Sequence, residues 1–460
     1  MKHTYENALK LLETRRRSAR PTGLTTPVST VQDTTTVNRN SGRGVPSLVG
    51  MKEWLQILGH SDNAVDSLNV IHVSGTKGKG STCTFTCSFL RAHSLRTGFP
   101  KRIGLYTGPH LQCVRERIQI DDHPVAEEMF TRYFFEVWDR IMPKGTELDA
   151  GVTKQPRYLQ FLAILAFHTF IKEEVDAAIF EVHHGGENDA TNVIRNPVVT
   201  GITSLGMDHV AQLGPTVETI AWHKAGIFKP GAPAFSVTQD PGPAEVMRKR
   251  ALDKGTTLTF ISANECLPNG RVLSVPVQRL NCSLALELTK AFLQTKAPGH
   301  ILSDADIYHG IESFQLAGRF EIIDEGQLQW FVDGAHNILS LEQTAEWFAK
   351  NTNEQKNKVT PGHVIFTTYQ EKDGDPINQS IKDSKPLSHD VCALYSSVWK
   401  ELDPQAMVTT TPTIEGAVRL AREIGDREEG MQVLVTGSLH MVGGALSLLR
   451  PSSRTQKLAS

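Results

Sequence analysis

The chain has 460 residues, of which 39% are hydrophobic, enough to fill two cores of ordinary size. Its 48 Lys and Arg residues are balanced by 50 Asp and Glu residues, which excludes the strong positive charge that holds a nucleic acid or an anionic membrane. The 6 cysteines include no Cys-x-x-Cys pair, a pattern typical of a reducing compartment without disulfides or structural zinc. We therefore expect a two-domain cytoplasmic protein that binds small molecules, with no nucleic-acid or membrane partner. A monomer is our expectation for its oligomeric state, although composition does not determine it.

Two segments could be mistaken for membrane or targeting elements. The most apolar stretch, Phe161 to Ile171, covers only about half of the ~20 residues that a membrane-spanning helix needs. Residues 15–42 begin with three arginines and continue with many Ser and Thr residues, as transit peptides do, but Glu6, Glu13 and Asp33 argue against one. We expect no membrane span and no organellar leader, with a mitochondrial form as the alternative.

The first part of the chain alternates between strands and helices. Tyr5 to Leu12 predicts an amphipathic helix, and Thr22 to Pro46 predicts a loop. Beyond Leu48, the predicted elements are strands at Asn69 to Val73, Ala177 to Val182 and Val198 to Ser204 and helices at Ser81 to Ala92 and Pro156 to Lys172. Apolar strands separated by helices favour an α/β domain with a mainly parallel sheet.

A predicted helix from Asn281 to Thr295 ends at Ala297-Pro298-Gly299, where proline and glycine stop helices. We place the domain boundary there, which gives domains of residues 1–297 and 298–460. The second, smaller α/β domain has predicted strands at Phe320 to Ile323, Leu328 to Val332, His363 to Thr367, Val391 to Tyr395 and Gln432 to Val435, with helices near 339–350, 414–424 and 441–450. Asn351 to Val359 and Glu371 to His389 predict surface loops.

The strongest motif is the loop Gly75-Thr76-Lys77-Gly78-Lys79-Gly80-Ser81, which follows an apolar strand and opens a helix. Glycines let backbone N–H groups surround phosphate oxygens, and the helix N-terminus adds positive potential. Lys79 supplies a charge for the phosphates and Ser81 a hydroxyl for magnesium. A glycine-rich turn without a ligand is the simpler alternative, but the order of strand, lysine and helix favours a phosphate-binding loop. Gly80 separates Lys79 from Ser81, unlike the plain G-x-x-x-x-G-K-[ST] pattern.

The variant G-T-x-G-K-G-S resembles the loop of the folylpolyglutamate synthases, within the Mur ligase superfamily. Further similar segments follow in the family's order, from about Tyr5 to about Leu449: Gly104 to Leu111, Val114 to Ile118, Glu181 to Asn192, Ser204 to Gly214, Ala221 to Gly231, Leu280 to Ala285, Leu316 to Glu321, Val332 to Asn337 and Val435 to Gly444. The resemblance implies a P-loop ATP-binding domain of the Mur ligase central type, followed by a smaller Rossmann-like domain of the Mur ligase C-terminal type.

The resemblance also implies an activity. The family is an ATP-dependent ligase that adds L-glutamate to the γ-carboxylate of a reduced folate or folylpolyglutamate. An amide does not form from a carboxylate and an amine in water without activation, so ATP would phosphorylate the carboxylate and the glutamate amine would attack the acyl phosphate. The expected cofactors are ATP and Mg²⁺, with a monovalent cation such as K⁺ as a further candidate.

Carried over residue by residue, the resemblance assigns the nucleotide contacts to Asn281, Arg319, Asp333 and His336 and to six residues of the phosphate loop: Gly75, Thr76, Gly78, Lys79, Gly80 and Ser81. The metal ligands would be Ser81, Glu181, His209 and Lys224, and the residues bordering the folate Thr107, Pro109 and His110. The family carbamylates the lysine that matches Lys224, a reaction that needs an unprotonated amine and is favoured by burial near other cations. Lys79, His209 and Lys224 are therefore the predicted catalytic residues.

Simpler interpretations of these residues stay open. Alone, Glu181 and Lys224 would be solvated charges, His209 a structural histidine, His110 a capping residue and Asp333 part of a turn.

The chain departs from the family pattern at His183-His184, where a glycine and an aliphatic residue usually precede Gly185-Gly186. Histidine lacks the conformational freedom of glycine, so the pair could block close approach of the backbone to a ligand. Gly108 replaces a usual serine, and Met207 a common isoleucine. Two alternative functions follow, a ligase for another carboxylic acid and a nucleotide-binding scaffold without catalysis. Dihydrofolate synthase activity on dihydropteroate is a variant of the leading hypothesis.

Overall fold

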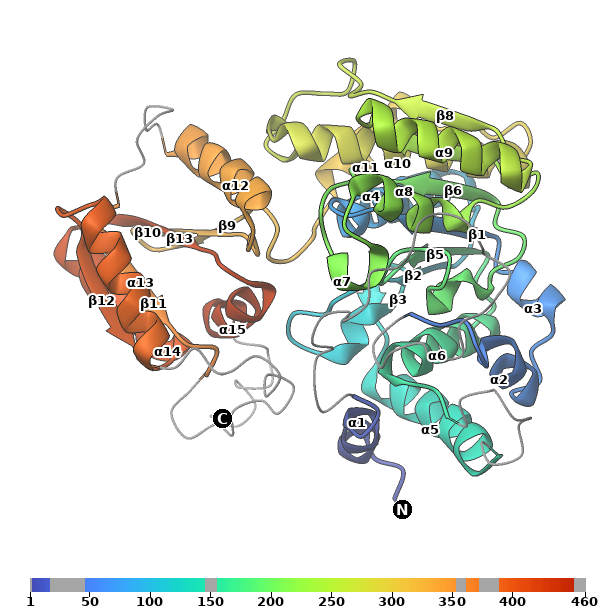
Figure 1. Cartoon of the computed structure of the whole chain (residues 1–460), viewed down its shortest axis with the longest axis horizontal. Coiled ribbons are helices and arrows are strands. Elements are labelled where there is room, and N and C mark those ends of the chain that lie inside the picture. The colour runs from blue at the N-terminus through green and yellow to red at the C-terminus, as the bar shows by residue number, and fades with distance from the viewer. Residues whose placement is uncertain (1, 17–45, 145–154, 353–360, 372–388, 451–460) are drawn as a thin grey trace. The chain divides into compact units, whose positions relative to one another are not determined.

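The computed structural model describes residues 2–16, 46–144, 155–352, 361–371 and 389–450 (Figure 1). The predicted loops at Thr22 to Pro46, Asn351 to Val359 and Glu371 to His389 lie mostly outside these residues. The chain divides into two compact units. Unit 1 comprises Met1–His110 and Val114–Gln315, and unit 2 comprises Leu111–Cys113 and Leu316–Ser460.

Unit 1 is built on an 8-stranded sheet in the order β4-β3-β2-β5-β1-β6-β7-β8. The strands are β1 Val70–Ser74, β2 Ile103–Tyr106, β3 Ile118–Ile120, β4 His123–Pro124, β5 Ala177–Glu181, β6 Val199–Ile202, β7 Ala234–Val237 and β8 Leu258–Ile261. Neighbouring strands from β2 to β8 along this order pair in parallel. The pairs β2–β3 and β3–β4 at the edge are antiparallel. The central strands β1, β5 and β6 are buried along their whole length, as parallel strands covered on both faces are. The prediction of a mainly parallel sheet is confirmed.

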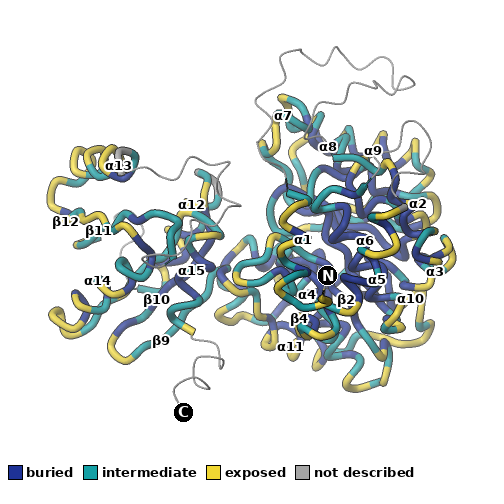
Figure 2. The backbone as a smooth tube through the Cα atoms, turned by 90° about the horizontal axis from the view of Figure 1, so that it is seen from below, coloured by how far each residue is buried: buried dark blue, intermediate teal, exposed yellow. Residues whose placement is uncertain are grey.

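Helices cover both faces of this sheet. They are α1 Tyr5–Glu13, α2 Met51–Ile57, α3 Asp62–Asp66, α4 Lys79–Thr97, α5 Glu127–Lys144, α6 Tyr158–Lys172, α7 Val210–Leu213, α8 Val217–Lys224, α9 Pro241–Lys254, α10 Pro276–Lys296 and α11 Asp304–Glu312. One core joins α5 and α6 to one face of the sheet, and another joins α4 and α10 to the opposite face. Figure 2 shows the buried segments gathered in the interior of unit 1. The apolar stretch Phe161 to Ile171 belongs to α6, whose residues from Phe161 to Phe167 are wholly buried. No helix among the described residues has both the length and the hydropathy to cross a lipid bilayer.

The division between the units falls after Gln315, later than the predicted boundary at residue 297. The break at Pro298-Gly299 leads into α11, which packs against α4 and so belongs to unit 1. Arg96 of α4 donates to the Asp306 carboxylate of α11, at 3.0 Å from Nε to Oδ1 and 2.6 Å from Nη2 to Oδ2. A turn signal marks the end of a helix, but it does not reveal where the next helix will pack.

Replacing Asp306 with asparagine is expected to lower the free energy of unfolding by about 2 kcal/mol. The substitution removes the buried carboxylate charge that pairs with Arg96, while the guanidinium group of Arg96 stays partly solvated. Burial raises the pKa of Asp306, but hydrogen bonds from Arg96 and Ser303 outweigh burial and hold the pKa below its usual value. The stabilisation is therefore present above the ordinary carboxyl pKa of 3.8 and is lost as the pH falls below it. Urea denaturation at pH 7 and pH 3 measures the difference, with the exposed Asp304→Asn as the control. An equal loss at both pH values would contradict this account.

Unit 2 contains two small sheets and four helices among its described residues. The strands are β9 Glu321–Glu325, β10 Leu328–Val332, β11 His363–Thr367, β12 Met407–Thr411 and β13 Met431–Val435, and the helices are α12 Ile338–Asn351, α13 His389–Leu402, α14 Ile414–Arg427 and α15 Leu439–Leu449. One sheet has the order β13-β10-β9, with β10 parallel to β13 and antiparallel to β9. The second sheet pairs β11 with β12 in parallel. Strand β12 was not predicted.

The predicted strand at Val391 to Tyr395 is wrong, because these residues belong to α13. Tyr395 and Trp399 both contact Phe366 of β11, with ring centroids 6.1 Å and 6.2 Å away. Residues four positions apart reach the same partner only on a helix. A short apolar segment does not distinguish a strand from one face of a helix.

Candidate active site

The phosphate loop connects the central strand β1 to α4. Gly75 and Gly78 have φ angles of +145° and +89°, which favour glycine. A Cβ atom at Gly75 would lie 1.8 Å from Oγ1 of Thr203, and one at Gly78 would lie 2.2 Å from Oδ1 of Asn281. The loop therefore packs directly on Asn281 of α10, a predicted nucleotide contact. The N–H groups of the first turn of α4 have no acceptor within the helix, so they are available to an anion.

Two of the predicted catalytic residues meet at this loop. Lys79 Nζ donates to the backbone oxygen of Gly75 at 3.0 Å, and Lys224 Nζ, from the end of α8, donates to the same oxygen at 2.7 Å. Lys224 is 3% exposed. Burial, reinforced by the charge of Lys79, holds the pKa of Lys224 well below its usual value. The amine of Lys224 is therefore more often unprotonated at neutral pH than the amine of an exposed lysine.

Glu181 lies at the carboxyl end of β5, beside β1, and is 4% exposed. Its Oε2 accepts hydrogen bonds from the Thr107 hydroxyl and from the backbone N–H of Gly108, the latter at 3.2 Å. The end of β2, parallel to β5, brings these residues together. The predicted substrate loop thus contacts the predicted metal ligand directly. In the same loop, Pro109 is exposed and His110 accepts a hydrogen bond from Arg117 Nε at 2.8 Å.

The histidine pair lies in a loop organised by Asp189. The Asp189 carboxylate accepts the backbone N–H groups of His183 and His184, at 3.2 Å and 2.9 Å. Neither histidine has a positive φ angle, so the glycine that His183 replaces is not required for the backbone. The backbone of this loop packs too closely for a side chain at Gly186 instead, because a Cβ atom there would lie 2.6 Å from the backbone oxygens of His223 and Lys224. Neither histidine therefore conflicts with the backbone conformation of this loop. Asp189 lies within the segment Glu181 to Asn192 that resembles the family, but the sequence alone did not predict its role in holding this loop.

His209 precedes α7 with a φ angle of +49°, and its ring lies edge-on to that of His184, with centroids 4.4 Å apart. Burial lowers the pKa of His209, and it lowers the pKa of His184 to about 3. The charges of Lys79 and Lys224 also act on His209, which places it with the two lysines. In the part of the chain that the structure describes, no hydrogen bond or ion pair joins His209 to Glu181, and no three or more His, Cys, Asp or Glu side chains form a metal-binding group. The metal-ligand set remains a prediction.

The predicted nucleotide contacts of unit 2 surround the turn after β10. Asp333 is 3% exposed, and its oxygens accept hydrogen bonds from the N–H groups of Phe320 and Ala335 at 3.0 Å and 2.9 Å. His336 Nδ1 lies 3.0 Å from the backbone oxygen of Gly334, and a Cβ atom at Gly334 would lie 3.2 Å from Nη1 of Arg319. Asp333 therefore fixes the turn that carries His336 and lies beside Arg319.

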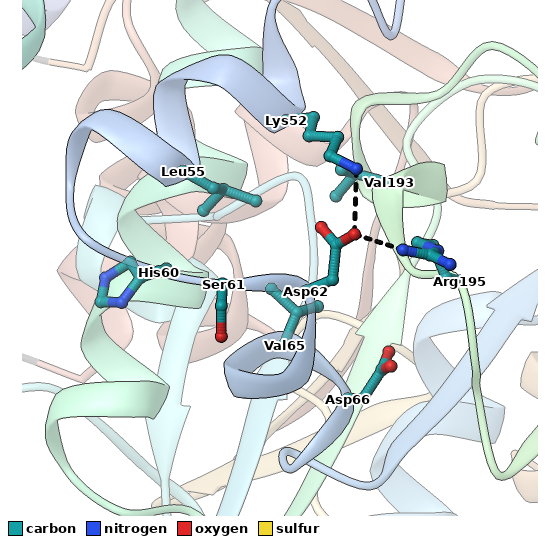
Figure 3. A pocket seen from close by; sticks show the side chains of 9 residues that line it. All are labelled: Lys52, Leu55, His60, Ser61, Asp62, Val65, Asp66, Val193 and Arg195. Atoms are coloured by element: carbon teal, nitrogen blue, oxygen red, sulfur yellow. Dashed lines mark hydrogen bonds and ion pairs between the residues drawn. The ribbon is translucent and has the colours of Figure 1, made fainter.

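A separate small cavity lies between α2 and α3 (Figure 3). Its lining residues are Lys52, Leu55, His60, Ser61, Asp62, Val65, Asp66, Val193 and Arg195. Its volume of about 10 Å³ has room for roughly one water molecule. None of the predicted site residues lines it.

A mainly parallel sheet whose central strand enters a glycine-lysine loop at a helix N-terminus defines an α/β protein with a nucleotide-type phosphate site. No protein-family profile matches the chain. The chain is 38% identical to the folylpolyglutamate synthase of Neurospora crassa over 452 residues, covering 88% of this chain and 85% of that protein. It is 37% identical to the probable folylpolyglutamate synthase of Schizosaccharomyces pombe, covering 88% of each chain. The chain belongs to the folylpolyglutamate synthase family.

A solved structure supports the fold independently. The folylpolyglutamate synthase of Mycobacterium tuberculosis, in complex with ADP and AMPPCP, superposes with a TM-score of 0.70 at 23% identity, over 88% of this chain and 96% of that one. At this identity the likeness establishes the fold alone.

Proposed function

We propose that this protein is an ATP-dependent ligase that adds L-glutamate to the γ-carboxylate of tetrahydrofolate and its polyglutamates. The observation that carries the proposal is the meeting of Lys79 and Lys224 at the Gly75 oxygen, 3.0 Å and 2.7 Å away. Lys79 supplies the charge for the phosphates, and beside it lies Lys224, whose pKa is lowered. The proposed reaction uses the first to bind ATP and the second as a carbamate. Membership of the family across most of the chain supplies the substrate class.

In the proposed reaction, the γ-carboxylate of the acceptor attacks the γ-phosphorus of ATP, and ADP leaves. The glutamate amine then attacks the resulting acyl phosphate, and phosphate leaves as the amide forms. Lys79 and the first-turn N–H groups of α4 stabilise the charge on the phosphoryl oxygens during transfer. Catalysis comes mainly from this positioning and electrostatic stabilisation.

Ser81, Glu181, His209 and Lys224 are the residues proposed to hold Mg²⁺. The Ser81 hydroxyl in the first turn of α4 and the Glu181 carboxylate at the end of β5 are hard oxygen donors, which suit a partly hydrated magnesium ion. Lys224 can join them only as a carbamate, because an ammonium group repels a cation. His209 is an imidazole, a less usual magnesium ligand. Bound magnesium would supply positive charge to the phosphate oxygens, and a monovalent cation such as K⁺ is proposed as an additional cofactor.

The finer fold assignments are part of the same proposal. Unit 1 is a P-loop domain of the Mur ligase central type, and unit 2 is a Rossmann-like domain whose Arg319, Asp333 and His336 serve the nucleotide. All 6 cysteines are free thiols, which supports a reducing compartment such as the cytoplasm. The monomeric state stays a prediction.

The experiment that tests the proposal is ADP release by the purified protein with ATP, magnesium, L-glutamate and tetrahydrofolate. Release that requires both tetrahydrofolate and glutamate supports the ligase. ATP binding without release under any condition would favour the scaffold, and release only with another carboxylic acid would favour a ligase of different specificity. The backbone at the histidine pair adopts no conformation that requires glycine, so the fold is compatible with the pair under all three functions.

A further inference from the structure

Three buried polar side chains gather beneath the loop Thr107–His110. Tyr106 ends β2 and is fully buried, Arg117 ends the short 3₁₀ helix Val114–Arg117 and is 7% exposed, and the side chain of His183, after β5, is 5% exposed. The rings of Tyr106 and His183 meet edge to face, with centroids 5.1 Å apart. The backbone oxygen of Arg117 accepts the N–H of Thr107 at 3.0 Å, which ties the arginine to the end of β2. We call Tyr106, Arg117 and His183 the buried polar cluster.

The cluster has unused hydrogen-bonding capacity. Among the described residues, neither ring nitrogen of His183 nor the hydroxyl of Tyr106 has a hydrogen-bond partner, although all three atoms are buried. Arg117 Nε donates to His110, and no carboxylate in the described ranges lies within ion-pair distance of its guanidinium group. The Asp189 carboxylate lies 3.9 Å from Nδ1 of His183, beyond hydrogen-bond distance. Buried polar atoms are nearly always hydrogen-bonded and buried charges nearly always paired. Such a group of unsatisfied atoms points to a ligand.

The chemistry of the cluster selects an anion. A guanidinium group, a phenol hydroxyl and an imidazole N–H are all donors, and the planar fork of arginine matches a carboxylate with two parallel hydrogen bonds. Arg117 repels a cation, and the phosphates of ATP already have their site at the loop before α4.

Gly108 and His183 both belong to the surroundings of this cluster. A Cβ atom at Gly108 would lie 2.4 Å from Nη1 of Arg117, so the glycine leaves room for the guanidinium group. His183, whose ring meets that of Tyr106, adds a donor to the same cluster.

The cluster is also close to the reacting groups. Gly108 and Thr107 hold Glu181, and the charge of Lys79 reaches His183. The terminal glutamate of a folate acceptor has two carboxylates, of which only the γ-carboxylate is activated. We propose that Arg117, assisted by Tyr106 and His183, binds the α-carboxylate of the acceptor's terminal glutamate and so directs the γ-carboxylate to ATP. This inference rests on the proposed function.

The test compares the binding of two acceptors, tetrahydrofolate and its analogue with an α-carboxamide in place of the α-carboxylate, in the presence of AMPPCP and magnesium. Isothermal calorimetry on the full chain gives both dissociation constants. The wild-type protein is expected to bind the acid about 10- to 100-fold more tightly, the range for hydrogen bonds to a charged group. In Arg117→Gln this preference is expected to fall below about 3-fold. ATP-analogue affinity should not change.

Arg115→Gln is the matched control, because Arg115 lies in the same 3₁₀ helix but donates to the Val125 backbone oxygen and pairs with Glu127. It should keep the wild-type preference. Tyr106→Phe is a second variant that removes only the hydroxyl, and it should weaken the preference several-fold without lowering the melting midpoint. The subsite is refuted if the wild type binds both acceptors equally, or if Arg117→Gln and Tyr106→Phe keep the full preference, in which case the cluster holds internal water only. Failure of the wild type to bind either acceptor would overturn the proposed function itself.

Discussion

Replacing Lys79 with alanine is expected to reduce acceptor-dependent ADP release by roughly 10²- to 10³-fold or more. Lys79 Nζ lies 3.0 Å from the Gly75 oxygen, at the mouth of the phosphate loop, and supplies positive charge to the loop. Without it, the transferring phosphoryl group loses its main side-chain counter-charge in unit 1. Steady-state kinetics of ADP release with tetrahydrofolate and glutamate measure the effect on kcat.

Lys77→Ala provides the control within the same loop. Lys77 Nζ lies 3.9 Å from the Asp208 carboxylate, and its side chain is 35% exposed, so its charge is partly solvated and partly balanced by Asp208. We expect its removal to change kcat by no more than a few-fold. Equal rates for Lys79→Ala and the wild type would disprove the assignment of the phosphate loop.

Replacing Lys224 with alanine is expected to lower kcat by roughly 10²- to 10³-fold, as for Lys79→Ala. The site would lose an anionic oxygen that Lys224 can supply only as a carbamate. The lowered pKa of Lys224 leaves more of its amine unprotonated at pH 7 to 8, and the unprotonated fraction rises with pH. Wild-type protein treated with bicarbonate at pH 8 should therefore carry one CO₂ on Lys224. Intact mass measurement under non-acidic conditions detects the adduct, and added formate should partly restore the alanine variant.

Lys229 gives a matched comparison, since burial, followed by the charge of Lys254, lowers the pKa of Lys229 to about 8. Its Nζ lies 3.4 Å from the Asn192 backbone oxygen, and no hydrogen bond or ion pair ties it to the phosphate loop in the described structure. Lys229→Ala should keep most of the activity and the mass adduct. A wild-type protein without the adduct, together with an active Lys224→Ala variant, would rule out the carbamate.

Much of the fold could be predicted from the sequence. Strands β1, β5, β10 and β11 are near-continuous apolar runs, and their limits were predicted to within a residue or two. The loop at residues 75–81 was identified because its glycines, lysine and hydroxyl follow a strand in a fixed order. Helix α6 was distinguished from a membrane span by its length. These features depend on residues that are neighbours along the chain.

What could not be predicted depends on residues that are distant in sequence. Helix α11 belongs to unit 1 through the contact of Asp306 with Arg96, and no local pattern marks that pairing. The segment at Val391 to Tyr395 is part of helix α13, and Tyr395 packs against Phe366 of the distant strand β11. The pairing of the Lys79 and Lys224 amines at one oxygen likewise comes from the fold, although each lysine was singled out separately.

The histidine pair shows where a sequence argument about glycine reaches its limit. A histidine in place of a glycine conflicts with the fold only where the backbone needs a positive φ angle or a close approach. At His183 neither condition holds, whereas both are met by the glycines that follow: Gly185 has a φ angle of +67°, and Gly186 faces the end of α8. The distinction requires the backbone angles and the neighbouring atoms.

The mass of the product tests the proposed ligase activity. The purified protein would be incubated with tetrahydrofolate, ATP, magnesium and isotopically labelled L-glutamate, and the folates would be separated and their masses measured by mass spectrometry. We expect products longer by whole glutamyl residues, each carrying the label in a γ-linked amide. Unchanged tetrahydrofolate, with a protein that still binds ATP, would contradict the proposed function.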